Sequence, residues 1–282
     1  MNTVCMSEDE FKKGSIAQYS ASELSQSEFI SEFFLKNRPV IIKDAISNSR
    51  ASAWTVQSIK KDIPNQKVQI RNHASGKLFN AKDMSQEKTE MDLYEFLDVI
   101  ESGNYSVPLY LAQTELKNLL PNFSDYIGRF PYLRKWDYLL QTNIWIGTPG
   151  LATPAHYDLS HNFYQQIRGH KRVTLFSPED SPYLYINPKV PLVSSVDVGN
   201  PDLNKFPNFA KATPIQFILG PGDSVFIPAR WWHFIESTDD NAISINQWFL
   251  RVWSRNTNQI KLISFLLGFI VKQILGIKSK QY

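Results

Sequence analysis

The residue types best suited to chemistry in this chain are two histidines and an aspartate. His156 and Asp158 are separated by one residue, and His233 lies far along the chain, at the end of a run that begins with Gly222-Asp223. Two imidazoles and one carboxylate form the ligand set of the facial triad, which binds iron(II) and leaves positions open for a cosubstrate and dioxygen. The pattern therefore predicts a metal site suited to an oxygenase, although a His-X-Asp pair by itself is a weak indication.

Strand geometry indicates how the three side chains would meet. Successive side chains of a β-strand point to opposite faces, so a strand through His156 and Asp158 places both on one face and Tyr157 on the other. His233 must then come from a distant strand that pairs nearby. The Gly-Asp turn at 222–223 and the apolar residues that follow it are typical of the lead-in to such a strand.

The composition permits this interpretation without requiring it. The chain has 282 residues, 43% of them hydrophobic and 13% aromatic, which suffices for one main domain with a sizeable core. A formal net charge of +3 is small, so the overall field gives no strong argument for a nucleic-acid partner. The single cysteine, Cys5, excludes an internal disulfide, and the polar, acidic amino terminus is unlike a signal peptide, so we expect a cytoplasmic protein.

The first third of the chain predicts a mixture of short helices and strands. Apolar residues at helical spacing predict an amphipathic helix over 21–36, with Ser20 and Glu23 as its capping box. Further helices are expected at 54–61 and 91–101, and strands at 40–42 and 67–71. Residues 1–104 are therefore expected to form a mixed α/β region that packs on the core.

From about residue 105 the pattern changes to short apolar runs separated by glycine and proline. The runs lie at 109–111, 142–146, 162–166, 172–176, 215–219, 224–227 and 242–249. Many short strands with turn residues between them predict a mainly β fold with flanking helices, most simply a double-stranded β-helix or jelly roll that holds the metal ligands inside. The expected catalytic core spans 105–253, and residues 200–209 are expected to form a long surface connection.

The remaining histidines are weaker candidates for metal ligands. His73 follows a strand-like run and His170 lies in a predicted hairpin, so both are interpreted as surface or turn residues. His161 is three residues past Asp158, but the chain can curve it away from the metal. We expect His161 to contact a substrate or cosubstrate instead.

Two blocks of sequence together resemble one enzyme family. The first runs from Thr153 to Asp158 and from Asn162 to Pro178, and the second covers residues 222–237. In this order they are similar to the JmjC or cupin-like dioxygenases and, among them, to the asparaginyl hydroxylase of hypoxia-inducible factor. Residues 200–209 extend the resemblance, which covers 109–249. It implies a jelly-roll core, iron(II), the cosubstrate 2-oxoglutarate, and dioxygen.

The resemblance also implies roles for single residues. Lys171 matches the lysine that pairs with the distal carboxylate of 2-oxoglutarate, and Thr153 and Tyr110 match hydroxyl donors to the same carboxylate. A buried lysine needs such a counter-anion, because an unpaired buried charge is costly; a surface lysine and a core tyrosine are the alternatives. Asn162 and Asn246 match amides near the iron-bound end of the cosubstrate, and turn or core hydrogen bonds are their alternative role.

The substrate is less clearly marked than the cosubstrate. Asn143 departs from the asparaginyl hydroxylase and resembles the Asn-X-Trp pattern of other JmjC hydroxylases. Trp232, Ile235 and Trp248 are expected to wall the site and exclude water, with ordinary core as the alternative for each tryptophan. We expect hydroxylation of a protein side chain. An RNA base or an N-methyl group are alternative targets within the family, and a noncatalytic binding module is the alternative outside it.

The carboxy-terminal segment carries a separate apolar feature. Residues 260–277 are strongly apolar, but Lys261 and Lys272 interrupt them, so the uncharged run at 262–271 is too short to span a bilayer. We expect residues 254–282 to form a helical segment through which two copies dimerise. Packing within the chain and attachment to a membrane surface are the alternatives.

Overall fold

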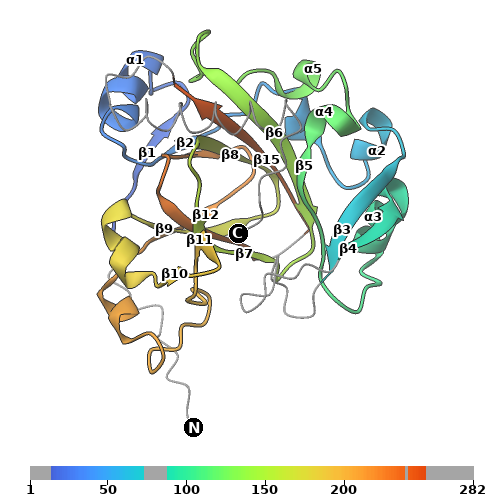
Figure 1. The fold of residues 1–282 in the computed structure, drawn as a ribbon. Helices are drawn as coiled ribbons and strands as arrows, with labels where there is room; N and C mark the ends of the chain where they lie inside the picture. Colours follow the sequence, from blue (N-terminus) through green and yellow to red (C-terminus); the bar gives the residue numbers. More distant parts are fainter. Residues whose placement is uncertain (1–13, 73–87, 239–240, 252–282) are drawn as a thin grey trace, which may run out of the picture.

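Two large sheets form the framework of the molecule. The computed structural model describes residues 14–72, 88–238 and 241–251, and within these ranges the sheets face one another across the interior seen at the centre of Figure 1. Every strand pair in the described ranges is antiparallel except β1 with β2, which are parallel. This confirms the predicted mainly β, jelly-roll fold.

The larger sheet has nine strands among the described residues. In spatial order they are β1 (Ala17–Ser20), β2 (Val40–Lys43), β13 (Ser224–Ile227), β8 (His161–Arg168), β15 (Ala242–Leu250), β6 (Tyr138–Gly147), β5 (Leu109–Glu115), β3 (Lys67–Asn72) and β4 (Lys88–Asp92). The first four strands of the chain therefore extend this sheet at both of its edges.

The smaller sheet carries two of the predicted metal ligands on neighbouring strands. Its six strands among the described residues are, in spatial order, β10 (Ile186–Asn187), β11 (Val190–Ser194), β7 (Ala152–Tyr157), β14 (Trp232–Ser237), β9 (Lys171–Phe176) and β12 (Ile215–Leu219). Strand β14 lies between β7 and β9, and its register sets His233 opposite His156. Pairing of these distant segments is what creates the site.

Short helices cover the outside of the sheets (Figure 1). They are α1 (Gln26–Glu28), the π-helix η1 (Phe29–Phe34), η2 (Arg50–Ala53), α2 (Ile59–Asp62), α3 (Leu93–Ser102), α4 (Leu116–Leu119), α5 (Ser124–Ile127), η3 (Pro178–Tyr183) and η4 (Pro207–Lys211). Phe29 of η1 packs on the outer face of the larger sheet, with its ring 5.4 Å from Phe163 and 4.9 Å from Phe226. The main hydrophobic core therefore lies between the outer helices and the larger sheet, and not between the two sheets.

The predicted helix over 21–36 is wrong in its start and in its winding. Ser20 and Glu23 do contact one another, with Ser20 N donating to Glu23 Oε2 at 3.0 Å, but they close a turn that precedes the helix. The observed cap is Ser25, whose Oγ accepts from Glu28 N at 3.1 Å. The wider π turns of η1 bury three phenylalanines against the sheet, which regular α-helical spacing does not anticipate.

The other predicted helices differ in how well they match. The helix expected at 54–61 is regular only over Ile59–Asp62, because Thr55 and Ser58 hydrogen-bond to each other's backbone N–H and form a capping turn before it. Helix α3 agrees with the prediction of 91–101 and ends at Gly103, whose φ of 71° is left-handed. The predictions for Cys5, His73 and residues 254–282 concern residues outside the described ranges. In the part of the chain that the structure describes, no helix is long and apolar enough to cross a membrane.

Candidate active site

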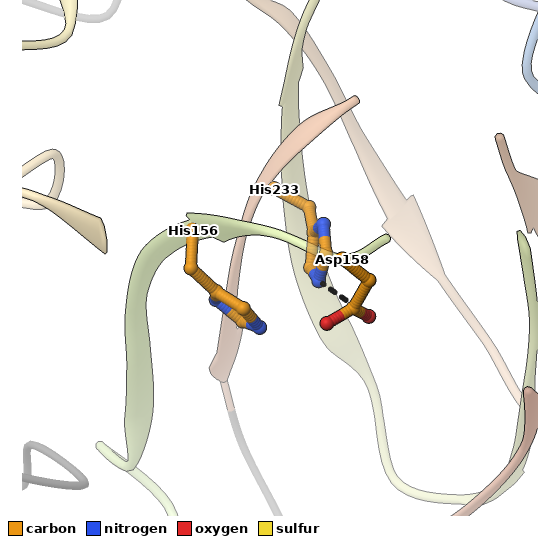
Figure 2. Close-up of side chains that lie close together, drawn as sticks. All are labelled: His156, Asp158 and His233. Carbon is orange, nitrogen blue, oxygen red and sulfur yellow. Dashed lines mark ion pairs between the residues drawn. The ribbon is translucent and has the colours of Figure 1, made fainter. Parts of the chain in front are cut away.

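The three predicted metal ligands converge at one point (Figure 2). His156 is near the end of β7, Asp158 directly follows that strand, and His233 lies on β14 opposite His156. One nitrogen or oxygen from each side chain lies within 4.8 Å of those of the other two. His233 Nε2 is 3.8 Å from Asp158 Oδ2.

Backbone carbonyls orient both imidazoles for metal binding. His156 Nδ1 is 2.8 Å from the carbonyl oxygen of Pro154, and His233 Nδ1 is 3.1 Å from that of Trp231. A carbonyl only accepts, so each Nδ1 carries the proton and each Nε2 keeps a lone pair. Burial, helped by the neighbouring His156, lowers the pKa of His233 to about 4, so this imidazole is neutral at neutral pH.

The residues fit a divalent cation. Asp158 Oδ2 is buried and has no hydrogen-bond partner among the described residues, while His233 turns an unprotonated nitrogen toward it. Two sets of lone pairs that face each other in a buried site repel unless a cation lies between them. Two neutral imidazoles and one carboxylate are the donors that a nonhaem iron(II) centre uses.

A cavity of about 260 Å³ opens beside these ligands and is lined from both sheets. Besides the three ligands, four of the residues assigned by resemblance line it, namely Tyr110, Thr153, Asn162 and Asn246. Ile235 and Trp248 line it as predicted, and Val190, Leu192 and Val193 of β11 add an apolar side.

Lys171 is buried, which excludes the alternative of a surface lysine at the hairpin. Its side chain is on β9, and its residue is only 1% exposed. Nζ donates to Ser237 Oγ at 2.6 Å and lies 5.3 Å from the centre of the Tyr110 ring. Burial lowers the pKa of Lys171 to about 7, and the nearby Glu236 opposes this shift only in part. A buried ammonium whose one hydrogen-bond partner in the described chain is a hydroxyl is a site for an anion.

The two hydroxyl donors expected beside Lys171 differ in their availability. Burial raises the pKa of Tyr110 well above its ordinary value, so its phenol is a protonated donor that faces the cavity. Thr153 Oγ1 donates to the carbonyl of Ile235 at 3.2 Å. In this arrangement the Thr153 hydroxyl has no proton left to donate to an anion in the cavity.

An amide network joins three strands at the other side of the cavity. Asn246 Oδ1 accepts from Trp145 Nε1 at 2.7 Å and from Asn143 Nδ2 at 3.3 Å. Asn246 Nδ2 donates to Asn162 Oδ1 at 3.3 Å. The Asn-X-Trp pattern at 143–145 therefore fixes the orientation of Asn246, and Asn246 in turn fixes Asn162.

Two residues expected near the site lie elsewhere. His161 points to the opposite face of β8, where its ring is 4.7 Å from that of Phe34 and its Nδ1 accepts from Ala229 N at 3.1 Å. Burial lowers the pKa of His161 to about 3, so it is a neutral core residue, and it does not line the cavity as expected of a substrate or cosubstrate contact. Trp232 is fully buried on the outer face of the smaller sheet, with Nε1 donating to Ser181 Oγ at 2.9 Å.

Three polar residues of the site were missed by sequence reasoning. Ser237 follows His233 by four residues on β14, and Tyr164 follows Asn162 by two on β8, so strand alternation already placed them on the inner faces. Gln113 had no such signal. It lines the cavity from an irregularity in β5, where its φ is 50°, and a bulge reverses the alternation that a sequence pattern assumes.

Comparison with known proteins identifies relatives of this chain. It is 42% identical to HSPB1-associated protein 1 of Mus musculus over 75% of the chain and 48% of that protein. It is 31% identical to JmjC domain-containing protein D of Dictyostelium discoideum (76% of the chain, 52% of that protein) and 27% identical to tRNA wybutosine-synthesizing protein 5 of Gallus gallus (80% and 75%). The chain thus spans about half the length of the first two proteins.

The match to a family model covers most of the described structure. The family is described as a cupin-like domain, and the match runs over residues 25–254, from the first helix to just past the last described strand. Together with the JmjC relative, this match shows that the chain belongs to the cupin-like family of JmjC-type domains.

Proposed function

We propose that this protein is an iron(II)- and 2-oxoglutarate-dependent oxygenase that hydroxylates a side chain of a protein substrate. The observation that carries the proposal is a His-Asp-His cluster beside a cavity whose lining residue Tyr110 has its ring 5.3 Å from Nζ of the buried Lys171. With iron(II) and dioxygen, 2-oxoglutarate is converted to succinate and carbon dioxide while a C–H bond is hydroxylated.

In this proposal the residues of the chain bind and orient the reactants. His156, Asp158 and His233 hold the metal, and Lys171 with Tyr110 holds the distal carboxylate of 2-oxoglutarate. The linked amides of Asn162 and Asn246 lie at the metal-bound end. The apolar side chains of the cavity exclude water from the reacting carbon.

A protein side chain suits the cavity better than RNA does. Within the described chain, no lysine or arginine lines the cavity, and its side toward β11 is formed by Val190 and Leu192. RNA binding relies on cations that contact phosphates. A relative named tRNA wybutosine-synthesizing protein 5 makes RNA the second candidate.

The test is succinate release by purified protein supplied with iron(II), ascorbate, 2-oxoglutarate and air. We expect slow release without any substrate. His233→Ala should reduce it on the order of 100-fold, because it removes a metal ligand. His170→Ala, which changes a histidine at the turn between β8 and β9, is the matched control and should leave release unchanged. Wild-type protein that binds no 2-oxoglutarate and releases no succinate would establish a noncatalytic binding module instead.

The substrate class is tested separately. Incubation with extract from the protein's own source, followed by mass spectrometry, should find a gain of one oxygen in peptides. A gain confined to nucleosides would favour RNA, and loss of a methyl group would identify a demethylase. The homodimer and the cytoplasmic location stay predictions from the sequence.

A further inference from the structure

Tyr164 is a buried tyrosine of the cavity to which no role has been given so far. It lies in β8, opposite Val225 of β13 and Asn246 of β15. It follows Asn162 by two residues, so both side chains turn to the inner face of the sheet, and both line the cavity. Tyr164 is 5% exposed. Its phenol is therefore part of the enclosed site.

The hydroxyl of Tyr164 lacks a partner in the described part of the chain. Its oxygen is buried and meets no group in hydrogen-bond geometry. Ser244 lies beside it, and the single Ser244 proton is directed to Gln166 Oε1 at 2.7 Å and not to Tyr164. By contrast, the hydroxyl of Tyr94, elsewhere in the protein, does have a partner and donates to the Lys60 carbonyl at 2.6 Å. A buried hydroxyl that stays unpaired is unfavourable unless a bound molecule supplies an acceptor.

The Tyr164 hydroxyl lies beside Ser244, which is opposite Gln166 near the turn that leads into β9 and Lys171. A charge on Tyr164 raises the pKa of Tyr110, so the two phenols share one region. The Tyr110 ring is in turn 5.3 Å from Lys171 Nζ. Burial raises the pKa of both phenols above the ordinary value, so both are protonated hydrogen-bond donors. Tyr110 therefore neighbours both Tyr164 and Lys171, in the region where an anion is expected.

Thr153 does not supply the hydrogen bond to the anion that was expected of it, so one donor is missing. The Thr153 proton is directed to the carbonyl of Ile235, so it does not point at the anion site. A carboxylate accepts about four hydrogen bonds, and bonds to a charged acceptor are the stronger ones. Lys171 and Tyr110 alone do not saturate it.

Resting on the proposed function, we propose that Tyr164 is a cosubstrate-binding residue whose hydroxyl donates a hydrogen bond to the distal carboxylate of 2-oxoglutarate. The bond gives Tyr164 the acceptor that it lacks and gives the carboxylate a third donor from a third strand. It does not touch the keto-acid end, which lies toward the metal ligands. Tyr164 therefore contributes to affinity for the dicarboxylate and not to metal binding.

The test is calorimetric binding to manganese(II)-loaded protein, which separates affinity from turnover. Two ligands are compared: 2-oxoglutarate, and 2-oxobutanoate, a keto acid without a distal carboxylate. Tyr164→Phe should weaken 2-oxoglutarate binding about 10- to 100-fold, the range expected for one hydrogen bond to a charged group. Binding of 2-oxobutanoate should stay within about twofold of wild type.

Thermal unfolding without ligand checks that the variant is folded. Tyr164→Phe removes an unpaired hydroxyl and should keep or raise the melting temperature. Tyr94→Phe is the matched control, which removes a paired hydroxyl far from the cavity and should lower the melting temperature without changing affinity.

Three outcomes would overturn the proposal. Unchanged 2-oxoglutarate affinity in Tyr164→Phe would assign the phenol to the core beside Ser244. Equal weakening of both keto acids would mean that the residue acts on the metal-bound end or on the fold. Wild-type protein that binds no 2-oxoglutarate would overturn the proposed function itself, and this result is distinguishable because it precedes any comparison of variants.

Discussion

Lys171 places its amine in the interior, with Ser237 as its hydrogen-bond partner. Burial lowers its pKa to about 7, so without an anion this lysine is only partly charged near neutral pH. A bound carboxylate favours the charged form and raises that pKa again. Binding of the anion and protonation of Lys171 are therefore linked.

This linkage predicts that the affinity for 2-oxoglutarate falls as the pH rises above about 7. The free protein has a lowered lysine pKa and the complex has a raised one, so at pH 8 binding must take up a proton. Calorimetry in two buffers of different ionisation enthalpy should give an uptake approaching one proton per ligand.

Two variants control this pH experiment. Lys171→Met should lose the proton uptake together with most of the affinity. Lys67→Met, at an exposed lysine paired with Asp92, should change neither. If wild-type protein bound 2-oxoglutarate at pH 8 with no exchange of protons, Lys171 would not be the group that meets the anion.

Single residues of the site could be predicted to different degrees. The residue types at 156, 158 and 233 predict a metal site directly, because few other chemistries use two histidines and a carboxylate. The burial of Lys171 could be inferred only from the family resemblance, because a lysine after glycine and histidine is typical of a surface hairpin. Hydrogen-bond partners such as Ser237 could not be predicted, because they depend on which strand pairs with β9.

At the scale of elements, the site depends more on which strands pair than on where each strand lies in the sequence. Most strands of residues 109–249 lie where alternation and apolar runs predict them. The register that sets His233 opposite His156 is a contact between distant segments, and local sequence does not determine it. The error over 21–36 has the same cause, because packing of Phe29 and its neighbours on the sheet overrides the regular helical period.

Adding one methyl group at the end of β6 is predicted to disturb the cosubstrate site. Gly147 pairs with Tyr110 of β5, and a Cβ atom there would lie 2.6 Å from the Tyr110 ring and 2.5 Å from Leu151 Cδ1. Gly147→Ala should therefore displace the Tyr110 ring, weaken 2-oxoglutarate binding and destabilise the fold by about 1–3 kcal/mol. Calorimetric affinity and urea unfolding measure the two effects.

Gly220→Ala provides the comparison for Gly147→Ala. At Gly220 the added Cβ would meet nothing nearer than His170 Cδ2 at 3.4 Å, which is an ordinary contact. This variant should bind and unfold like wild type. An unchanged affinity in Gly147→Ala would show that the position of the Tyr110 ring does not matter for the anion.

At the scale of the whole molecule, one buried ion pair connects three distant parts of the chain. Arg251 directly follows β15 and is 2% exposed. Its guanidinium donates to Asp137 through Nη2 at 2.6 Å and through Nε at 2.9 Å, and it lies 4.0 Å from the ring of Phe34 in η1. The pair thus joins β15, which is the last strand of the described residues, the segment before β6, and helix η1 on the outside of the larger sheet.

Asp137→Asn should therefore destabilise the whole fold and not only one strand. It leaves the Arg251 cation buried without its counter-charge, which costs about 3–5 kcal/mol in comparable pairs. Urea unfolding should show one cooperative transition at a lower midpoint. The double variant Asp137→Leu with Arg251→Met should recover much of the loss, because it removes both buried charges together. Glu32→Gln, which breaks the exposed pair with Lys36, should leave the midpoint nearly unchanged, and an equal shift in that variant would contradict the assignment of the buried pair as the connection that matters.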